Sequence, residues 1–378
     1  MVTIAVTREA AEEPRVAVSP ETVKKLVGAG ATVKVEAGAG ARSRFSDEAL
    51  KAAGAQIVSH DEALKGADVL LKVRRPSPDE LKALAPGALA IAALNPYDDR
   101  AGIDALAATG ASLFAMEFMP RTTRAQSMDM LSSQANLAGY KAVVDAAATF
   151  GQALPMMMTP AGTVPAAKAF IMGVGVAGLQ AIATARRLGA QVTATDVRPA
   201  TKEQVQSLGA KFIAVEDEEF KQAQTAAGYA KPMSAEYQAK QAELVASHVK
   251  NQDIIITTAL IPGRPAPKLI SKAMIESMKP GAVIVDLAAE RGGNTDLTEP
   301  GKTIETANGV KIAGPLNLAA SIAVNASALY AKNLLAFLDI MLDKKEKKLA
   351  VNWDDDIIKG TLVAKDGKVV HPNLAAKN

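Results

Sequence analysis

The chain of 378 residues contains no cysteine, so it has no disulfide, no thiolate nucleophile and no cysteine-ligated metal. Aromatic residues make up only 4% of it, and the formal net charge of +3 is close to balance. A nucleic-acid-binding protein would show a basic face with interleaved aromatic residues, so we expect no nucleic-acid partner. The hydrophobic content of 49% is ample for buried cores, and the length favours two domains.

The sequence also lacks the signals of a secreted or membrane-inserted protein. No apolar run approaches the roughly 18 or more residues of a membrane-spanning helix. The N-terminal residues 1–6, MVTIAV, form a short strand pattern and not a signal peptide. We therefore expect a cytoplasmic protein without direct membrane insertion, which leaves attachment to a membrane through partner subunits open.

Histidine is scarce, and the three histidines, His60, His248 and His371, adjoin no motif. We expect each of them to be structural or solvated. A dehydrogenase that acts on a hydroxy or amino acid moves a proton as well as a hydride, usually through such a side chain. No Ser/His/Asp arrangement, phosphate-binding P-loop or metal-ligand spacing is visible, so no metal is expected.

The most informative pattern present is a glycine turn between a strand and a helix. An apolar run ending at Ile171 predicts a strand, and residues 173–178, GVGVAG, follow it as a G-x-G-x-x-G. A predicted helix over 179–188 and a strand over 191–195 come next, and the strand ends at Asp196. This complete unit is typical of dinucleotide binding.

Each glycine has a physical task in such a turn. Gly173 permits the tight turn, Gly175 lets the backbone approach a pyrophosphate, and Gly178 lets the helix pack on the strand. The pyrophosphate is expected over Gly175, Val176, Ala177 and Gly178, at a helix N-terminus that favours anions.

Asp196 predicts which dinucleotide is bound. Its carboxylate can accept both ribose hydroxyls, and its charge would repel a 2′-phosphate, so NAD(H) is expected over NADP(H). Arg198 is the opposing feature, because an arginine there could meet a 2′-phosphate.

A recurring pattern predicts the fold: a helical stretch, then Gly-Ala, then an apolar strand. It occurs at Gly30-Ala31, Gly54-Ala55, Gly110-Ala111, Gly189-Ala190 and Gly209-Ala210. Strand–helix alternation in two sets, residues 1 to about 118 and about 168 to 315, predicts α/β architecture. We expect two doubly wound Rossmann-like parallel-sheet domains joined by two long helices, over 132–150 and 321–342. The domains would be 1–138 with 321–378, and 139–320, which binds NAD(H).

Several segments depart from this scaffold. Residues 156–165 predict a hairpin whose methionines are either core or a surface for a second copy of the chain. Residues 216–240 form a polar insertion, either a surface loop or a lid with Tyr229 at its tip. Gly38-Ala39-Gly40 predicts a turn, Asp366-Gly367 predicts a type I′ hairpin, and the lysines of 344–348 predict a solvated helix end.

The segment 121–132, RTTRAQSMDMLS, is unusually polar between an apolar strand and an apolar helix. Its bidentate donors, amide, carboxylate and hydroxyl could grip a nicotinamide carboxamide, which has one acceptor and two donors. The alternative is a helix-capping loop in which Arg121 and Asp129 pair. The spacing does not decide between them.

These residues carry a resemblance. Residues 121–140, RTTRAQSMDMLSSQANLAGY, together with GVGVAGLQAIATARRLGA and TDVR, resemble the soluble NAD(H)-binding component (domain I, the first portion of the alpha subunit) of proton-translocating NAD(P) transhydrogenases. The similarity runs over essentially the whole chain. It implies the separate-subunit form of the Re/Si-specific enzyme, with homodimeric assembly, an NADP(H)-binding partner subunit and membrane-spanning subunits that couple hydride transfer to proton translocation.

The resemblance also implies roles for individual residues. Arg121, Gln126, Asp129 and Ser132 would be catalytic: three would fix the carboxamide, and Gln126 would point toward NADP+ on the partner subunit. The implied NAD(H)-binding residues are Arg121, Gln126, Ser127, Met128, Asp129, Ser132, Gly173, Gly175, Val176, Ala177, Gly178, Asp196, Val197, Arg198, Gly228, Tyr229, Gln241 and Leu260.

Alanine dehydrogenase is the nearest relative by fold and the main alternative. Arg15 and Lys72 match its substrate-binding positions, but its catalytic histidine would fall within residues 92–96, where none exists. Glu290 stands at its catalytic aspartate position. Transfer between two nicotinamides needs no proton exchange at the site, so the absence favours transhydrogenation. A non-catalytic NAD(H)-sensing subunit is a second alternative, which would not need the polar loop.

Overall fold

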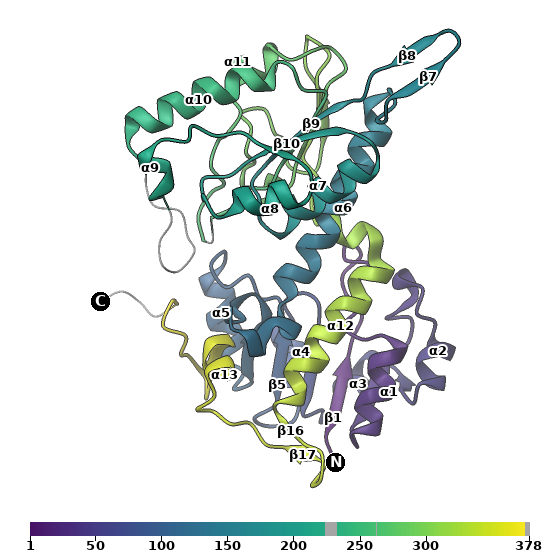
Figure 1. Cartoon of the computed structure of the whole chain (residues 1–378). Helices are drawn as coiled ribbons and strands as arrows, with labels where there is room; N and C mark the ends of the chain where they lie inside the picture. The colour runs from purple at the N-terminus through teal and green to yellow at the C-terminus, as the bar shows by residue number, and fades with distance from the viewer. Residues whose placement is uncertain (224–232, 262, 375–378) are drawn as a thin grey trace. The chain divides into compact units, whose positions relative to one another are not determined.

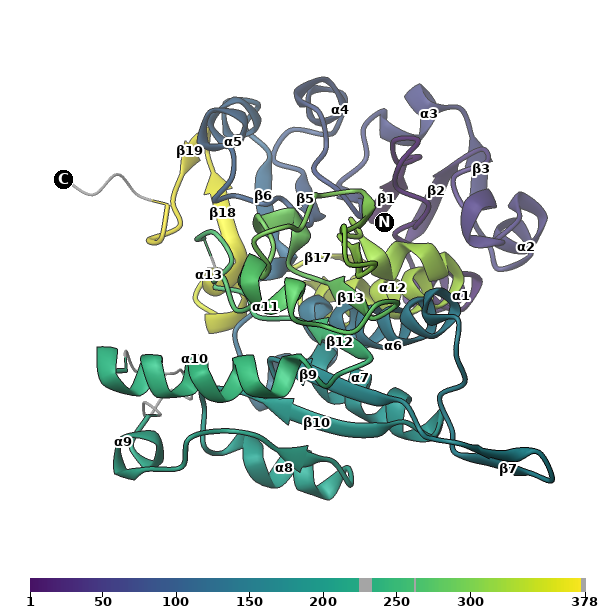
Figure 2. The ribbon, with the colours of Figure 1, turned by 90° about the horizontal axis from the view of Figure 1, so that it is seen from above.

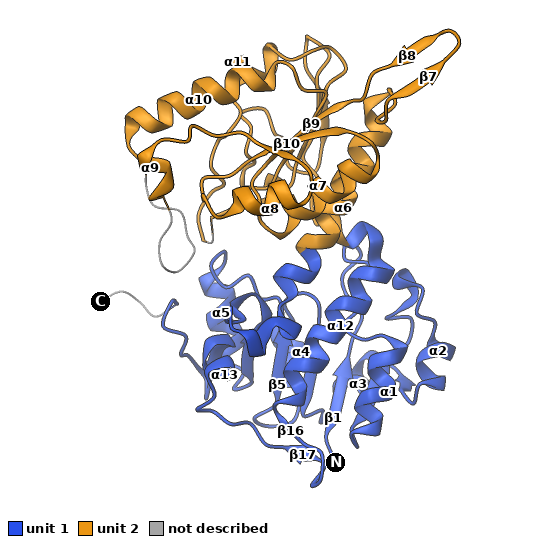
Figure 3. Ribbon diagram, in the orientation of Figure 1, with its two compact units in different colours: residues 1–134, 320–378 blue, residues 135–319 orange. Residues whose placement is uncertain are grey.

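The computed structural model describes residues 1–223, 233–261 and 263–374, and it divides into two compact units (Figures 1 and 3). Unit 1 comprises Met1–Gln134 and Ala320–Asn378, and unit 2 comprises Ala135–Ala319. The boundary falls inside helix α6 (Met130–Phe150), which begins in unit 1 and continues in unit 2.

Unit 1 is built on an eight-stranded sheet with the order β19-β18-β6-β5-β4-β1-β2-β3. The six parallel strands are β1 (Thr3–Val6), β2 (Thr32–Glu36), β3 (Gln56–Val58), β4 (Val69–Leu71), β5 (Leu89–Ala92) and β6 (Ser112–Ala115). The C-terminal segment adds β18 (Leu362–Lys365) antiparallel to β6, and then β19 (Lys368–Val369). Asp366 and Gly367 join the two at φ 52° and 79°, as a type I′ turn requires.

Helices cover both faces of this sheet, as buried parallel strands require. They are α1 (Pro20–Gly28), α2 (Asp47–Ala52), α3 (His60–Leu64), α4 (Pro78–Lys82), α5 (Arg100–Ala107), α12 (Ala323–Asp339) and α13 (Asp356–Thr361). On one face, Val6, Val35 and Phe114 pack with Leu334 and Phe337 of α12. On the other face, residues such as Leu70 and Leu113 pack with Ile103 and Leu106 of α5.

Unit 2 contains a seven-stranded sheet with the order β11-β10-β9-β12-β13-β15-β14. Its strands are β9 (Lys168–Met172), β10 (Gln191–Thr195), β11 (Lys211–Phe212), β12 (Ile254–Thr257), β13 (Val283–Asp286), β14 (Thr303–Glu305) and β15 (Lys311–Ala313). Only β14 runs antiparallel. Its helices are α7 (Val176–Arg187), α8 (Thr201–Ser207), α9 (Glu218–Lys221), α10 (Ala235–Val249) and α11 (Lys272–Glu276), with most of α6. Because β9 lies between β10 and β12, the strand order reverses there, and such a switch point is where open α/β sheets bind ligands. The predicted pair of doubly wound α/β sheets is confirmed.

A predicted hairpin and a predicted helix end have different outcomes. The segment 156–165 forms β7 (Met157–Thr159) and β8 (Gly162–Val164), an antiparallel hairpin that projects from unit 2 (Figures 1 and 2). Its methionines are exposed, so they are not core residues. The lysines of 344–348, predicted at a helix end, instead belong to the hairpin of β16 (Leu342–Asp343) and β17 (Lys348–Leu349), because α12 has already ended at Asp339.

The prediction that no apolar run approaches the length of a membrane-spanning helix needs correction. Within the described residues, the stretch Leu318–Asp339 is long and apolar enough to cross a membrane by length and composition. Lys332 and Asn333 interrupt this stretch, but its mean hydropathy stays high over the remaining residues. Its α12 portion packs in the core of unit 1, where Tyr330 and Leu334 are fully buried. Burial of this kind is what the apolar composition of a core helix provides.

Candidate functional site

The glycine turn of unit 2 follows β9 directly and has the geometry that a close-packed turn requires. Gly173 has φ +98°, and its carbonyl accepts a hydrogen bond from the Thr258 hydroxyl at 3.0 Å. A Cβ on Gly178 would lie 1.9 Å from the Gly173 carbonyl oxygen. Helix α7 can therefore approach the strand only because residue 178 has no side chain.

Gly175 differs from both, because nothing in the described part of unit 2 requires a glycine there. Its φ is −81°, and a Cβ would meet no described atom within 4 Å. It is the N-cap of the 12-residue helix α7, and no side chain caps that end. The first N–H groups of α7, at Val176 and Ala177, therefore face open space with the positive end of the helix dipole. This exposed backbone fits a pyrophosphate, which a side chain at residue 175 would obstruct.

Asp196 lies after β10, beside the glycine turn, and its carboxylate accepts four N–H groups. Oδ2 accepts the Val174 amide at 2.7 Å and Arg198 Nη2 at 2.9 Å. Oδ1 accepts the Arg198 amide at 2.9 Å and Arg198 Nε at 2.8 Å. A carboxylate offers about four lone-pair sites, so these bonds saturate it. A ribose diol would have to replace the two side-chain bonds from Arg198.

Asp196 also holds the Arg198 side chain in place. The hydrogen bond and charge of Asp196 raise the pKa of Arg198. Its guanidinium is thus neutralised by a carboxylate and does not present an unpaired cation to a 2′-phosphate.

Other predicted nucleotide residues of unit 2 differ in accessibility. Val197 and Leu260 are 50% and 54% exposed, as apolar contacts for a bound nucleotide should be. Gln241 is already occupied: its Oε1 accepts the Val215 amide at 2.9 Å, and its Nε2 donates to Thr195 Oγ1 at 3.3 Å. It supports the end of β10 beside Asp196. Gly228 and Tyr229 lie outside the described residues.

The polar loop lies in unit 1 as a short helix, η3 (Thr123–Met128), that leads into α6. Ala125 and Met128 are buried in the core and anchor the loop. Arg121, Gln126 and Ser127 are exposed. Within the described chain, the Gln126 side chain makes no hydrogen bond, so its amide is available to a ligand.

Asp129 and Ser132 cap α6. The Ser132 amide donates to Asp129 Oδ1 at 3.0 Å, and the Ser132 hydroxyl donates to Asp129 Oδ2. The bonds show that Asp129 caps the helix through Ser132, whereas the pairing of Arg121 with Asp129 and the grip on a carboxamide both stay predictions. The cap fixes both side chains in place, since a bidentate contact leaves the carboxylate little freedom.

The two cations of unit 1 that match alanine dehydrogenase positions are buried and neutralised internally. Arg15, 5% exposed, donates from Nε and Nη2 to both oxygens of Glu13 at 2.7 Å. Lys72, 6% exposed, pairs with Glu80 at 2.9 Å. Burial opposes ionisation of Glu13, but hydrogen bonds and charges from Arg15 and Arg74 outweigh it and lower the pKa to about 2. Neither cation is left to bind a substrate carboxylate.

The segment 92–96, where a catalytic histidine would fall, is held by other groups. Glu117 accepts the amides of Leu94 and Asn95, and Arg75 donates to both of their carbonyls, at 2.7 and 3.0 Å. Burial raises the pKa of Glu117. These bonds satisfy the backbone amides and carbonyls of Leu94 and Asn95, and Asn95 adopts the left-handed backbone with φ +47°. Glu290, which stands at the catalytic aspartate position of alanine dehydrogenase, accepts the Asn317 amide at 2.5 Å.

The histidines have structural partners, as expected. His60 Nδ1 lies 2.9 Å from Glu36, and His371 stacks on Phe118. His248 lies 2.8 Å from Thr193 Oγ1, and burial lowers its pKa.

Two supporting residues had no clear sequence signal. A Cβ on Gly139 of α6 would lie 2.0 Å from the Ala177 carbonyl oxygen, so α6 crosses the first turn of α7 at this glycine. A glycine inside a predicted helix was the only hint. Asp286, fully buried after β13, accepts the amides of Ala288 and Asn294 at 3.0 and 2.6 Å and fixes the following loop.

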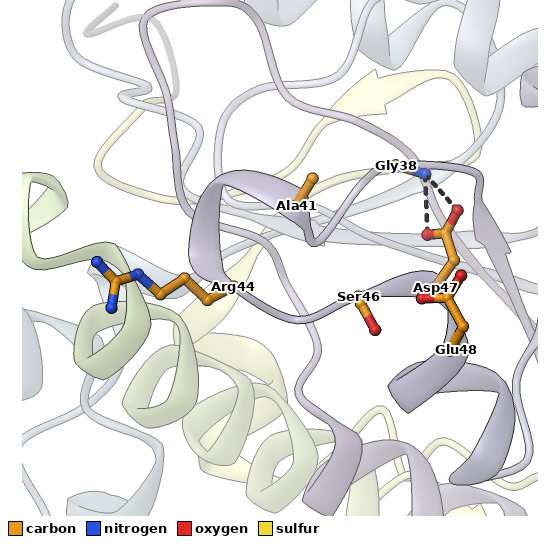
Figure 4. Close-up of a pocket in the computed structure, with 6 residues that line it drawn as sticks. All are labelled: Gly38, Ala41, Arg44, Ser46, Asp47 and Glu48. Atoms are coloured by element: carbon orange, nitrogen blue, oxygen red, sulfur yellow. Dashed lines mark hydrogen bonds between the residues drawn. The ribbon is translucent and has the colours of Figure 1, made fainter.

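The turn at Gly38–Gly40 in unit 1 is a structural turn, as predicted. The Gly38 amide donates to both Asp47 oxygens, at 2.9 and 3.0 Å (Figure 4). A Cβ on Gly40 would lie 2.3 Å from the Phe45 carbonyl oxygen. A shallow depression beside the turn is lined by Gly38, Ala41, Arg44, Ser46, Asp47 and Glu48. Because the glycine amide is already satisfied, the turn does not present the open backbone seen at Gly175.

Comparison with known proteins decides the family. The alanine dehydrogenase/PNT N-terminal domain model matches residues 5–138, and the C-terminal domain model of the same family matches residues 142–372. The chain belongs to the alanine dehydrogenase/PNT family.

Within the alanine dehydrogenase/PNT family, transhydrogenase chains resemble it more than alanine dehydrogenase does. It is 54% identical over 371 residues to the first portion of the NAD(P) transhydrogenase subunit alpha of Rhodospirillum rubrum, covering 97% of this chain and 96% of that one. A transhydrogenase structure from Sinorhizobium meliloti matches with a TM-score of 0.89 and 56% identity, covering 97% and 100%. An L-alanine dehydrogenase structure matches with 0.82 and 25%, covering 99% and 98%. The resemblance stated from the sequence is confirmed.

Proposed function

We propose that this chain is the NAD(H)-binding subunit of a Re/Si-specific, proton-translocating NAD(P) transhydrogenase. Hydride would pass from NADH on this subunit to NADP+ on a partner subunit. The observation that carries the proposal is the contrast between the two units: unit 2 has an open glycine turn, whereas the cations Arg15 and Lys72 of unit 1 are closed by Glu13 and Glu80. A chain that retains the dinucleotide turn but not an accessible substrate cation fits nucleotide-to-nucleotide transfer.

In this proposal, NADH supplies the hydride from its dihydronicotinamide ring when bound. The α7 N-terminus from Gly175 to Gly178 would hold the pyrophosphate, because its amides lack a side-chain cap. Asp196 would accept the ribose hydroxyls, which gives the preference for NAD(H). Val197 and Leu260 would contact the nucleotide through their exposed apolar surfaces.

The polar loop would orient the nicotinamide. Asp129 and Ser132 are fixed by their mutual hydrogen bonds, and Arg121 is exposed, so the three can present a constant set of donors and acceptors to a carboxamide. Gln126, with an unoccupied amide, would face the second nucleotide. Ser127 and Met128 are the neighbouring residues of the same loop, and the buried Met128 side chain anchors it in the core. Orientation of this kind is worth large rate factors without any proton transfer.

The proposed assembly follows the resemblance. NADP(H) would bind a separate subunit, and membrane-spanning subunits would couple transfer to proton movement and attach this cytoplasmic chain to the inner membrane. Self-association as a homodimer is supported by the β7–β8 hairpin, whose Met156, Met158 and Val164 are 63%, 79% and 37% exposed. Exposed apolar hairpins of this kind invite pairing with a second copy.

A single-turnover assay tests the function. Stopped-flow mixing of the NADH-loaded chain with an NADP+-binding partner should give rapid nicotinamide oxidation, which should be absent when the partner is omitted. Oxidation with the partner present but no NADP+ reduction would contradict direct transfer. Binding of NADH without any transfer would favour an NAD(H)-sensing subunit instead.

The alanine dehydrogenase alternative makes the opposite prediction. Alanine-dependent NAD+ reduction near 1 s⁻¹ or above would be the rate of a working enzyme. We expect none, because residues 92–96 contain no histidine and Arg15 and Lys72 are paired internally. Observed turnover of alanine in the purified chain would overturn the assignment of unit 1.

A further inference from the structure

A chain of four hydrogen bonds, buried at Arg15 and half-buried from Ser133 onward, links a guanidinium to the polar loop within unit 1. Arg15 Nη1 donates to Gln134 Oε1 at 2.8 Å, and Gln134 Nε2 donates to Ser133 Oγ at 3.2 Å. Ser133 Oγ donates to Asn333 Oδ1 at 2.7 Å, and Asn333 Nδ2 donates to the Ser127 carbonyl oxygen at 2.8 Å. The links come from the N-terminal loop, α6, α12 and the polar loop.

The two ends of this series of hydrogen bonds fix the direction in which each bond is donated. A guanidinium can only donate, and a backbone carbonyl can only accept. Gln134 must therefore present its oxygen to Arg15 and its NH₂ to Ser133, and Asn333 must present its NH₂ to Ser127. Turning any amide around would place donor against donor or acceptor against acceptor. Both amides thus donate in the direction from the buried cation toward the loop. The single Ser133 proton has two acceptors, Asn333 Oδ1 at 2.7 Å and the Met130 carbonyl at 3.2 Å, and the shorter bond continues the series.

Three side chains of this network are shielded from water, and the Ser133 side chain is half-buried. Arg15, Gln134 and Asn333 are 5%, 7% and 6% exposed. The remaining polar atoms are also satisfied: Glu13 pairs with the other edge of Arg15, and Gln134 donates a second bond to the Ala326 carbonyl at 3.1 Å. A buried group that loses its partner finds no water to replace it, so the network holds one arrangement.

The turns of η3 and the buried side chains of Ala125 and Met128 hold the loop in the core. At the two ends of η3, the Ala125 amide donates to the Thr122 carbonyl at 3.0 Å, and the Asp129 amide donates to the Gln126 carbonyl at a longer 3.4 Å. The bond from Asn333 to the Ser127 carbonyl is a further tie beside Gln126. A second tie, between Arg124 and Asp355 of the α13 N-cap, holds the other side of η3.

We propose that Arg15, Gln134 and Asn333 are positioning residues for hydride transfer. They fix the Ser127 carbonyl and, through the adjoining peptide, the direction of the exposed Gln126 side chain. The proposal rests on the function proposed for the loop. It assigns to the buried cation of unit 1 a role in the geometry of the loop, in place of a contact with substrate.

Asn333→Asp in the full chain is the decisive variant, because it keeps the acceptor for Ser133 and removes the donor to Ser127. Asn325→Asp, on an exposed position of the same helix, is the matched control. Loss of loop register by a fraction of an ångström should slow single-turnover hydride transfer to the NADP+-loaded partner by about tenfold or more. The dissociation constant for NADH should stay within about twofold, because the unit 2 contacts are unchanged.

A double-mutant cycle separates positioning from a general loss of structure. If Asn333 acts through Gln126, Asn333→Asp should slow transfer little further in a Gln126→Asn background. Fully multiplicative losses, or a wild-type rate in Asn333→Asp, would overturn the proposal. If Asn333→Asp does not fold, Ser133→Ala breaks the middle of the chain with a smaller change, and the same cycle applies.

Amide hydrogen exchange over residues 121–129 gives a readout independent of transfer. Exchange should be faster in Asn333→Asp than in Asn325→Asp, because the Ser127 tie is lost. Equal exchange would overturn the positioning role. Absence of transfer in the wild-type chain would refute the proposed function, whereas faster exchange in the variant would still support the role of Asn333 in the loop.

Discussion

Asp196→Ala should change which nicotinamide nucleotide the chain binds. In the structure the carboxylate accepts the Val174 amide and three N–H groups of Arg198. The substitution removes the acceptor for the ribose hydroxyls and, at the same time, leaves the Arg198 guanidinium without its carboxylate partner. Both consequences act on nucleotide choice, and they act in the same direction.

The magnitudes follow from these contacts. Hydrogen bonds to a charged group contribute about 1.5–3 kcal/mol, so NADH binding should weaken about 10- to 150-fold. For NADPH, loss of a carboxylate near the 2′-phosphate removes a repulsion, and the freed Arg198 adds an attraction. Such a charge pair at contact is worth about 1 kcal/mol in water and about 4 kcal/mol at an effective dielectric constant near 20, so NADPH binding should tighten at least about fivefold. The ratio of NADH to NADPH affinity should thus fall by at least about 50-fold.

Titration calorimetry with both nucleotides measures this ratio directly. Glu203→Gln is a suitable control, because it removes one exposed negative charge from the same unit without touching the glycine turn. Thermal melting must accompany the titration, since Asp196 also ties the Val174 amide. An unchanged nucleotide ratio in folded Asp196→Ala would refute the assignment of Asp196 as the ribose-binding carboxylate.

The remaining predictions concern the loop, the hairpin and a buried ion pair. Gln126→Asn shortens the side chain by one methylene and should slow single-turnover transfer on the order of 100-fold with near-normal NADH binding; a wild-type rate would leave Gln126 without a role in transfer. Met158→Asp places a charge on an apolar hairpin and should shift sedimentation from dimer to monomer at micromolar concentration; a monomeric wild type would contradict the premise. Arg15 and Arg74 lower the pKa of Glu13 to about 2, although burial alone would raise it. The ionised Glu13 therefore stabilises the fold by about 3 kcal/mol above pH about 4.5, and this stabilisation is lost as the pH falls toward 2. In Glu13→Gln, the dependence of unfolding free energy on pH over that window should flatten, and an unaltered slope would argue against the pairing.

Much of this protein is determined by local sequence. The Gly-Ala pairs end helices because glycine adopts the left-handed backbone that a helix C-terminus requires, and all five glycines have positive φ. The strand over 191–195, its terminal Asp196 and the preceding glycine turn follow from short-range constraints that a single stretch of chain contains. The same is true of the β7–β8 hairpin and the Asp366-Gly367 turn, whose backbone angles few residue types allow.

Tertiary structure alone decided how these residues are used. The sequence offered Arg198 as a possible phosphate ligand, and only the folded turn showed its guanidinium saturating Asp196. In the sequence Arg15 and Lys72 match the substrate-binding positions of alanine dehydrogenase, and only the fold pairs them with Glu13 and Glu80. Asn333 carried no signal at all, because its partners are about 200 residues away in the chain. Local propensity acts over a few residues, whereas hydrogen-bond partners and buried charges are chosen by packing between distant segments, so these roles become visible only in the fold.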